Sequence, residues 1–333
     1  MVRTTTHTTH ALDPIWKKAV VHLEAAGDKT PWNEQMKRIE QMWEEQRKGQ
    51  RPLPDIAAEF LPKMRDRRSR GTAVFIVHGS RRYLVTARHV LTDAEAAAVA
   101  PGMDLPDVFP DDAQRRQERI DNWIYPIIFR VPSLDEVKRW TGYTHPEFLM
   151  NLAAGVMWMH PYTFSEPYLD LAVISLDQHD GRFADDLVKV GYAPVTLADV
   201  DQKPSAEGAE IYSVGYPDAT AVLGQLPLHP ASANWASSAV SVPVHAFGRV
   251  AMLRDDLPYF LADISIYPGN SGGPVVEESK LVGIVSGQAA VENMRIPFAK
   301  VIKSSFIADL ISKQEAKDQG RTGVFAATSS ASA

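Results

Sequence analysis

From residue 71 onward, the chain consists mostly of short apolar or alternating runs, each bounded by Gly, Pro, Asn or Asp. Runs of this length with turn residues between them are typical of antiparallel strands in a sandwich or barrel. The clearest runs are GTAVFIVHG, RRYLVTARHVL, LAVISL, EIYSVGYP, VPVHAFGRVAML, YFLADISI, GPVVEE and LVGIVSG. The pattern predicts a mainly β domain over residues 70–317, ending in one helix at about 305–317, and a flexible tail at 318–333.

The first 69 residues follow a different pattern. Residues 1–10 are rich in Thr and His, which predicts disorder. Within residues 12–66, apolar side chains recur at spacings of three or four, which predicts amphipathic helices. We interpret residues 1–69 as a helical N-terminal extension. It would serve either as a cap on the β domain or, through residues 12–66, as a docking arm for a regulatory protein partner.

Residues 95–165 interrupt the strand pattern. The segments DDAQRRQERIDNW and LDEVKRWTGYTHPEFLMNLA look helical or irregular. We interpret this region as a long insertion within the β domain, one that could act as a lid or a substrate-selecting element.

Composition narrows the class of protein. With 333 residues, 45% of them hydrophobic, the chain can bury a full core. A net charge of −6 gives no electrostatic footprint for nucleic acid. The absence of cysteine excludes disulfides and thiolate metal sites, and it favours a cytoplasmic location. No signal-peptide pattern, transmembrane run, metal-ligand spacing or cofactor motif is visible, so no membrane partner and no cofactor are predicted.

The most informative motif is Pro-Gly-Asn-Ser-Gly-Gly-Pro at 268–274. A serine hydroxyl becomes a strong nucleophile only beside a base, and it needs backbone N–H groups that stabilise the oxyanion formed in the reaction. Flanking glycines let the backbone turn sharply enough to supply them. A glycine-rich turn with an incidental serine is the alternative for a bare GxSxG, but the full motif between two apolar strands favours Ser271 as a nucleophile.

Two further motifs supply a base and a carboxylate. His89 follows an apolar strand in TARHV, and Asp170 leads into another in LDLAVIS. Either residue alone could be structural. Their order along the chain, His then Asp then Ser, is the chymotrypsin-type order. The α/β-hydrolases place their histidine after the serine, and here the last histidine is His245, which excludes that class.

With these motifs in place, the sequence resembles the trypsin-like peptidases, and more narrowly their disulfide-free bacterial branch typified by the HtrA proteases. The resemblance covers about residues 70–312 and is carried by TARHV, DLAVISL, ADISIYPGNSGGPVV, LVGIVSG and IPFAKVIKSSFIADLI. It implies a fold of two six-stranded antiparallel β-barrels and the activity of a serine endopeptidase acting on protein or peptide substrates. A bacterial origin is expected on the same ground.

The resemblance also implies roles for individual residues. Ser271 would attack the scissile carbonyl, His89 would take its proton, and Asp170 would orient His89. The N–H groups of Gly269 and Ser271 would form the oxyanion hole.

Substrate-binding residues follow from the same comparison. Ser286, Gly287 and Gln288 would pair with the substrate as an added strand. Ser265, six positions before the nucleophile, would form the base of the S1 pocket. A neutral residue there favours an apolar or small substrate side chain over Lys or Arg.

The sequence departs from the family pattern at Asn270, which stands where zymogen-activated members have Asp. We therefore predict activity without N-terminal cleavage, restrained by a partner or a conformational change. No PDZ domain follows the last predicted helix. The alternative is a catalytically inactive protease fold that serves as an interaction module.

Overall fold

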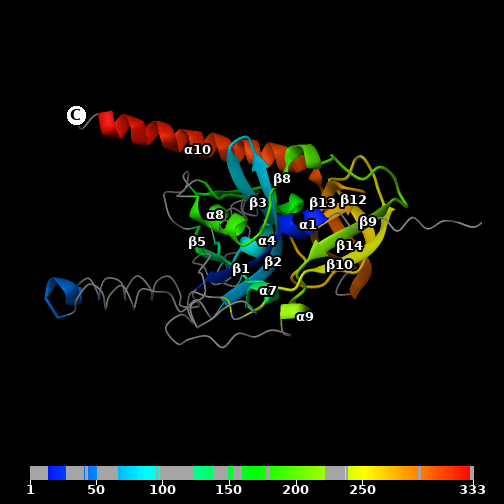
Figure 1. Ribbon diagram of the computed structural model, residues 1–333, viewed down its shortest axis with the longest axis horizontal. Coiled ribbons are helices and arrows are strands. Elements are labelled where there is room, and N and C mark those ends of the chain that lie inside the picture. The colour runs from blue at the N-terminus through cyan, green and yellow to red at the C-terminus, as the bar shows by residue number, and fades with distance from the viewer. Residues whose placement is uncertain are drawn as a thin grey trace, which may run out of the picture.

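The computed structural model describes residues 14–27, 41, 44–50, 67–94, 97, 123–137, 149–152, 160–177, 181–221, 237, 239–291 and 294–330. The described strands form two β units that pack side by side, and a long C-terminal helix lies across the first of them (Figure 1).

The second unit is a closed barrel of six strands in the order β10-β11-β14-β13-β12-β9. Every neighbouring pair in it is antiparallel. The strands are β9 Glu210–Gly215, β10 Val244–Met252, β11 Tyr259–Ile264, β12 Pro274–Glu277, β13 Lys280–Val291 and β14 Met294–Lys303.

The first unit is an eight-stranded sheet in the order β5-β4-β1-β2-β3-β7-β6, with β8 paired to β2. Its strands are β1 Val20–Gly27, β2 Arg67–His78, β3 Arg81–Ala87, β4 Ile127–Arg130, β5 Leu149–Asn151, β6 Tyr162–Phe164, β7 Leu171–Ser175 and β8 Val195–Thr196. The predicted mainly β, chymotrypsin-like class is confirmed, while this unit has eight strands where six were predicted.

Strand β1 corrects the predicted N-terminal helix. Helix α1 spans only Pro14–Ala19, and the chain then continues as β1 between β2 and β4. Every residue of β1 is buried. His22 and Glu24 alternate with apolar residues in β1, but a run of eight residues is short enough to fit a helical period as well. Of residues 28–66, the structure describes only 41 and 44–50; residues 41 and 44–47 are helical, and 48–50 form a turn.

The predicted insertion at 95–165 is also corrected. It supplies three strands of the first sheet, β4, β5 and β6, together with helix α7 Leu134–Val137. Strands of three or four residues are too short to show a period in the sequence, which explains why they read as irregular. Residues 95–96, 98–122, 138–148 and 153–159 lie outside the described part of the chain.

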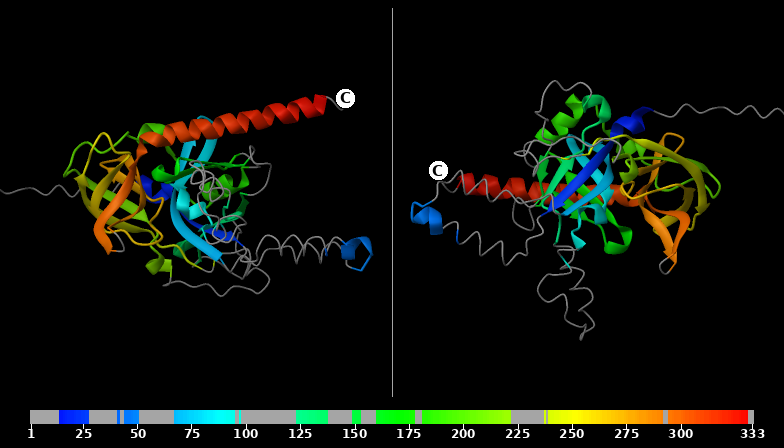
Figure 2. Two further views of the ribbon diagram at one scale, coloured as in Figure 1. Left: turned by 180° about the vertical axis from the view of Figure 1, so that it is seen from behind. Right: turned by 90° about the horizontal axis from the view of Figure 1, so that it is seen from below.

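The C-terminal helix α10 spans Ile307–Ser330 and extends well past its predicted end at 317 (Figures 1 and 2). Asp318, the first residue of the predicted tail, is buried. It accepts hydrogen bonds from Arg81 at 2.6 Å, Ser175 at 2.8 Å and Gln314 at 2.8 Å. The contacts with strands β3 and β7 stabilise the helix past residue 317, where the sequence pattern no longer predicts a helix. No helix in the described part of the chain is both long and apolar enough to cross a membrane.

An apolar core joins the two units. It contains Tyr83 of the first unit, Ile284 and Ile302 of the second, and Ile311 of α10. Trp16 of α1 is fully buried in the same core and donates a hydrogen bond to the carbonyl of Ser279 in the second unit at 3.1 Å. The residues before β1 therefore help to fix the two units relative to each other.

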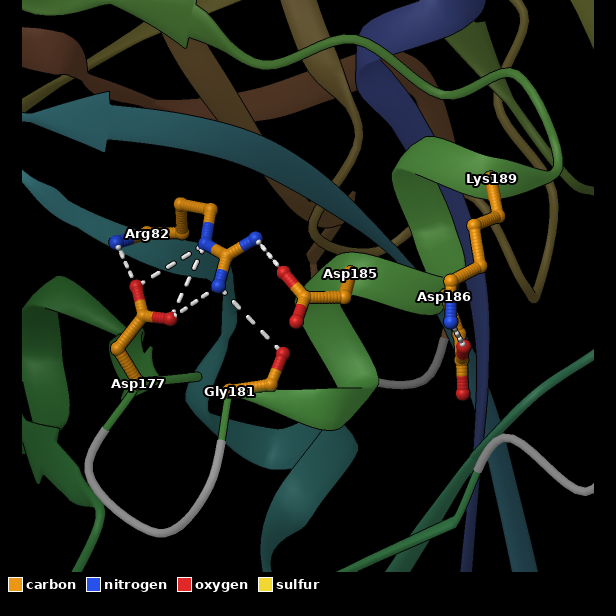
Figure 3. A network of polar contacts seen from close by, with 6 residues as sticks. All are labelled: Arg82, Asp177, Gly181, Asp185, Asp186 and Lys189. Carbon is orange, nitrogen blue, oxygen red and sulfur yellow. Dashed lines mark hydrogen bonds and ion pairs between the residues drawn. The ribbon is translucent and has the colours of Figure 1, made fainter.

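A charged network fixes helix α8, Arg182–Lys189, to strand β3 of the first sheet (Figure 3). Arg82 of β3 donates to Asp177 from its backbone N–H at 2.7 Å and from its guanidinium, which also bonds Asp185 of α8. Gly181, at φ +67°, allows the turn that brings Asp177 and α8 to the same guanidinium.

Candidate active site

The loop that carries Ser271 connects β11 to β12 and depends on two glycines. Gly269 has φ +96° and Gly272 has φ +85°, a region that disfavours residues with a Cβ. A Cβ would also lie 2.3 Å from the Tyr216 carbonyl oxygen at the first position and 2.0 Å from that of Thr72 at the second. Both positions therefore require glycine.

Hydrogen bonds hold five consecutive carbonyls of this loop. Tyr267 O accepts from Asn270 N at 3.0 Å, Pro268 O from Asp218 N at 2.8 Å, Gly269 O from Thr72 Oγ1 at 2.8 Å, Asn270 O from Gly273 N at 2.9 Å, and Ser271 O from Thr72 N at 2.7 Å. Among the described residues, none accepts a hydrogen bond from the backbone N–H of Gly269 or Ser271. The loop thus combines fixed carbonyls with two donors that are open to a ligand.

His89 and Asp170 meet because their strands pair. His89 lies on the short helix α4, Arg88–Leu91, directly after β3, and Asp170 directly precedes β7, with Ala87 opposite Leu171. Asp170 has φ 49°, and its carboxylate accepts from the backbone N–H of His89 at 3.0 Å. Its Oδ2 lies 2.8 Å from His89 Nδ1. This contact assigns the proton to Nδ1 and leaves Nε2 as the basic nitrogen.

Ser286 of β13 connects the other two groups. Its Oγ donates to Asp170 Oδ2 at 2.6 Å, and its carbonyl accepts from Ser271 Oγ at 3.4 Å. Within the described part of the chain, no hydrogen bond joins Ser271 Oγ to His89. The serine hydroxyl therefore lies in the same cluster as the His89–Asp170 pair, turned toward the Ser286 carbonyl.

The predicted substrate residues precede and follow Ser271 along the chain. Ser286, Gly287 and Gln288 are consecutive on β13, and a Cβ on Gly287 would have no atom within 4 Å, so the space beside this strand is open. Gln288 Nε2 donates to the Ile296 carbonyl at 3.1 Å. Ser265 is exposed between β11 and the Ser271 loop.

Sequence reasoning missed several residues that shape the site. Thr72 holds two loop carbonyls, and its own carbonyl accepts from Thr86 Oγ1 at 2.7 Å. Asp218 holds a third loop carbonyl through its backbone. Arg88, beside His89, is buried with its guanidinium 5.1 Å from the Phe164 ring centre. Burial lowers the pKa of Arg88, and the nearby Asp170 acts in the opposite direction. A threonine in an apolar strand, or a backbone donor, leaves no signal in a single sequence.

In the part of the chain that the structure describes, no group of three or more His, Asp or Glu side chains is placed to hold a metal ion. The residues that converge are those of acyl-transfer chemistry: a hydroxyl, an imidazole held by a carboxylate, and two backbone donors.

Comparisons with known proteins agree with this geometry. The family model described as "Trypsin-like peptidase domain" matches residues 71–284, which is more than half of the chain. No curated protein matches the chain by sequence. Among solved structures, "HtrA-type protease AlgW with tripeptide" has a TM-score of 0.43 and 14% identity, covering 89% of this chain and 59% of its own.

A variant of the same HtrA-type protease with a decapeptide has a TM-score of 0.43 and 15% identity, covering 90% of this chain and 64% of its own. The chain spans less than two thirds of the length of both structures, and similarity at this TM-score carries no argument of its own. The assignment rests on the family model: the chain belongs to the trypsin-like peptidase domain family, as the sequence motifs predicted.

Proposed function

We propose that the protein is an endopeptidase that cleaves protein or peptide substrates through an acyl-enzyme formed on Ser271. The observation that carries this proposal is the His89–Asp170 hydrogen bond of 2.8 Å beside a serine loop whose carbonyls at 267–271 are held, while no described residue accepts from the N–H of Gly269 or Ser271.

The chemistry follows from these positions. Rotation of the Ser271 hydroxyl from the Ser286 carbonyl toward His89 Nε2 would prepare it for attack on a substrate carbonyl. His89 would take the proton and later give it to the leaving amine, while Asp170 stabilises the imidazolium. The N–H groups of Gly269 and Ser271 would stabilise the oxyanion.

Among the described strands, the pairing of β12 with β13 ends at Ile284, so Ser286–Gln288 are paired with β14 on one side only, which supports binding of the substrate as an added strand. The exposed, neutral Ser265 is consistent with an apolar or small residue before the scissile bond. A cytoplasmic location and a bacterial source remain predictions, supported by the absence of cysteine and by the motif resemblance.

We further propose activity without N-terminal cleavage. Asn270 is buried and neutral, so it needs no cationic amino terminus as a partner. The loop around it already has its carbonyls held by the rest of the fold. Regulation by a partner, or by movement of the Ser271 hydroxyl, belongs to the same proposal. The present contact of Ser271 with Ser286 is the observation that favours the alternative, an inactive interaction module.

A fluorophosphonate probe, which reacts with activated serines, tests the proposal on the full chain beside Ser271→Ala. Labelling that disappears in the variant, together with cleavage of an unstructured protein, is the expected result. Folded wild-type protein that neither reacts nor cleaves would support the inactive module instead.

A further inference from the structure

The segment that connects β9 to β10 forms a hydrogen bond with the peptide bond between Pro268 and Gly269. Asp218, the first residue of helix α9 Asp218–Ala221, donates its backbone N–H to the Pro268 carbonyl at 2.8 Å. The carbonyl and N–H of a trans peptide point in opposite directions. Fixing the Pro268 carbonyl toward Asp218 therefore fixes the Gly269 N–H in the direction away from it.

Strand β1 holds the beginning of this connection. The Tyr216 hydroxyl donates to the carbonyl of Val20 at 2.9 Å. The Tyr216 ring stacks on His22 of β1, with ring centres 4.9 Å apart and planes within 4°. Both contacts are buried, and Tyr216 lies two residues before Asp218. The position of Asp218 thus depends on β1 through one aromatic side chain.

The same strand holds the end of the connection. His22 Nδ1 lies 3.1 Å from Ser241 Oγ, and Ser237 Oγ bonds Glu24. Glu24 is fully buried and also accepts from Arg68 at 2.7 Å. Alternate residues of β1 therefore reach the segment between β9 and β10 from one face of the strand.

The Asp218 side chain lies behind the Gly269 peptide. Its Oδ1 would be 3.1 Å from a Cβ on Gly269. Burial raises the pKa of Asp218, while the charge of Arg70 lowers it and that of Glu24 raises it again. Arg70 Nε in turn lies 3.7 Å from Glu24. Two charged side chains, Glu24 of β1 and Arg70 of β2, thus lie near Asp218 behind the loop that carries Ser271.

We propose that β1 positions the loop that carries Ser271 and its two oxyanion donors. Tyr216 and Asp218 are the positioning residues between β1 and that loop. The inference rests on the proposed function of that loop. Strand β1, at residues 20–27, lies outside the region matched by the family model, residues 71–284. The element that prepares the site is therefore supplied by this chain's N-terminal segment.

The first test separates the backbone of Asp218 from its side chain. Asp218→Pro removes both the N–H and the carboxylate at a helix start, where proline is tolerated, whereas Asp218→Ala removes the carboxylate and keeps the N–H. Because loss of one oxyanion donor costs about 10²–10³ in kcat, a misplaced donor should cost Asp218→Pro about 10–100-fold in kcat with KM nearly unchanged. Asp218→Ala should lose much less. Equal losses in the two variants would overturn the role of the N–H.

The second test starts from β1. Tyr216→Phe keeps the ring on His22 but removes the hydroxyl, which bonds the Val20 carbonyl and also the side chain of Tyr192. Its matched control is Tyr212→Phe, a buried tyrosine of β9 whose ring packs on His245 and Phe247. We expect Tyr216→Phe to lower kcat by about tenfold and the control to leave it unchanged.

A readout independent of activity is hydrogen exchange over residues 266–273 in the full chain. Both Asp218→Pro and Tyr216→Phe should speed exchange there by about tenfold while leaving β7 unchanged. Unchanged exchange at 266–273, or an equal rise in β7, would overturn the inference whatever the activity. Wild-type protein that the fluorophosphonate does not label would overturn the proposed function, and exchange would still decide the role of β1.

Discussion

Acid should destabilise this fold through His22. The imidazole is buried on β1, and its Nε2 has no hydrogen-bond partner among the described residues. Burial lowers the pKa of His22 to about 3, and the charge of Arg70 acts in the same direction. In the unfolded chain the pKa of histidine is about 6.5. Between these two values the unfolded chain binds a proton that the folded chain does not, so stability that is complete above about pH 6.5 is lost as the pH falls.

The size of this loss follows from the difference in pKa. Each pH unit below the unfolded value costs about 1.4 kcal/mol, so about 2 kcal/mol should be lost at about pH 5. His22→Phe keeps a ring against Tyr216 but loses the contact with Ser241, which costs about 1 kcal/mol at neutral pH. The variant should therefore be the less stable protein at neutral pH and the more stable one below about pH 5.9.

Urea unfolding followed by tryptophan fluorescence measures both curves, since Trp16 is fully buried at the interface of the two units. The exposed His78→Ala is the matched control for removal of a histidine. If the free energies of unfolding of wild type and His22→Phe stay parallel from about pH 7.5 to about pH 5, the reasoning is refuted. His22 would then make no pH-dependent contribution to stability.

Three further predictions concern the site and its support. Ser286→Ala should lower kcat/KM on a peptide substrate by about 10-fold or more, because a hydrogen bond to a charged group is worth about 1.5–3 kcal/mol; an unchanged value would mean that Asp170 needs no such partner. Gly272→Ala should abolish fluorophosphonate labelling and cost more than about 1–3 kcal/mol in urea unfolding, since both its φ and its contacts exclude a Cβ. Arg130→Met should cost about 3–5 kcal/mol in unfolding because it leaves the buried Glu136 carboxylate without its cationic partner, and adding Glu136→Leu should restore most of that loss. A double variant as unstable as the single one would contradict this account of the pair.

The sequence predicted the parts of the site that lie in local motifs. His89 and Asp170 each adjoin an apolar strand, and pairing of β3 with β7 brings them into contact. Ser271 lies among glycines whose conformation only that residue type allows. The roles of these residues in catalysis remain predictions for the probe experiment.

Other parts of the fold and of the site could not be predicted from the sequence. Strand β1 has His22 and Glu24 among apolar residues over only eight positions, so its period could not be distinguished from that of a helix. Helix α10 continues because Asp318 is bonded to strands far away in the sequence. Thr72 and Asp218 act on the Ser271 loop from 197 and about 50 residues away, the second through a backbone N–H that every residue except proline carries.

The order of the strands along the chain also determines when the site can form during synthesis. Ser271 lies in a loop of the closed barrel, and β14, which pairs with both β11 and β13, ends only at Lys303. A ribosome that has released β1, His89, Asp170 and even Ser271 has therefore not yet released β14, the strand that completes the barrel to which the Ser271 loop belongs. Because domains fold as units, the nascent chain stays without an assembled nucleophile loop until nearly all of the peptidase domain has emerged.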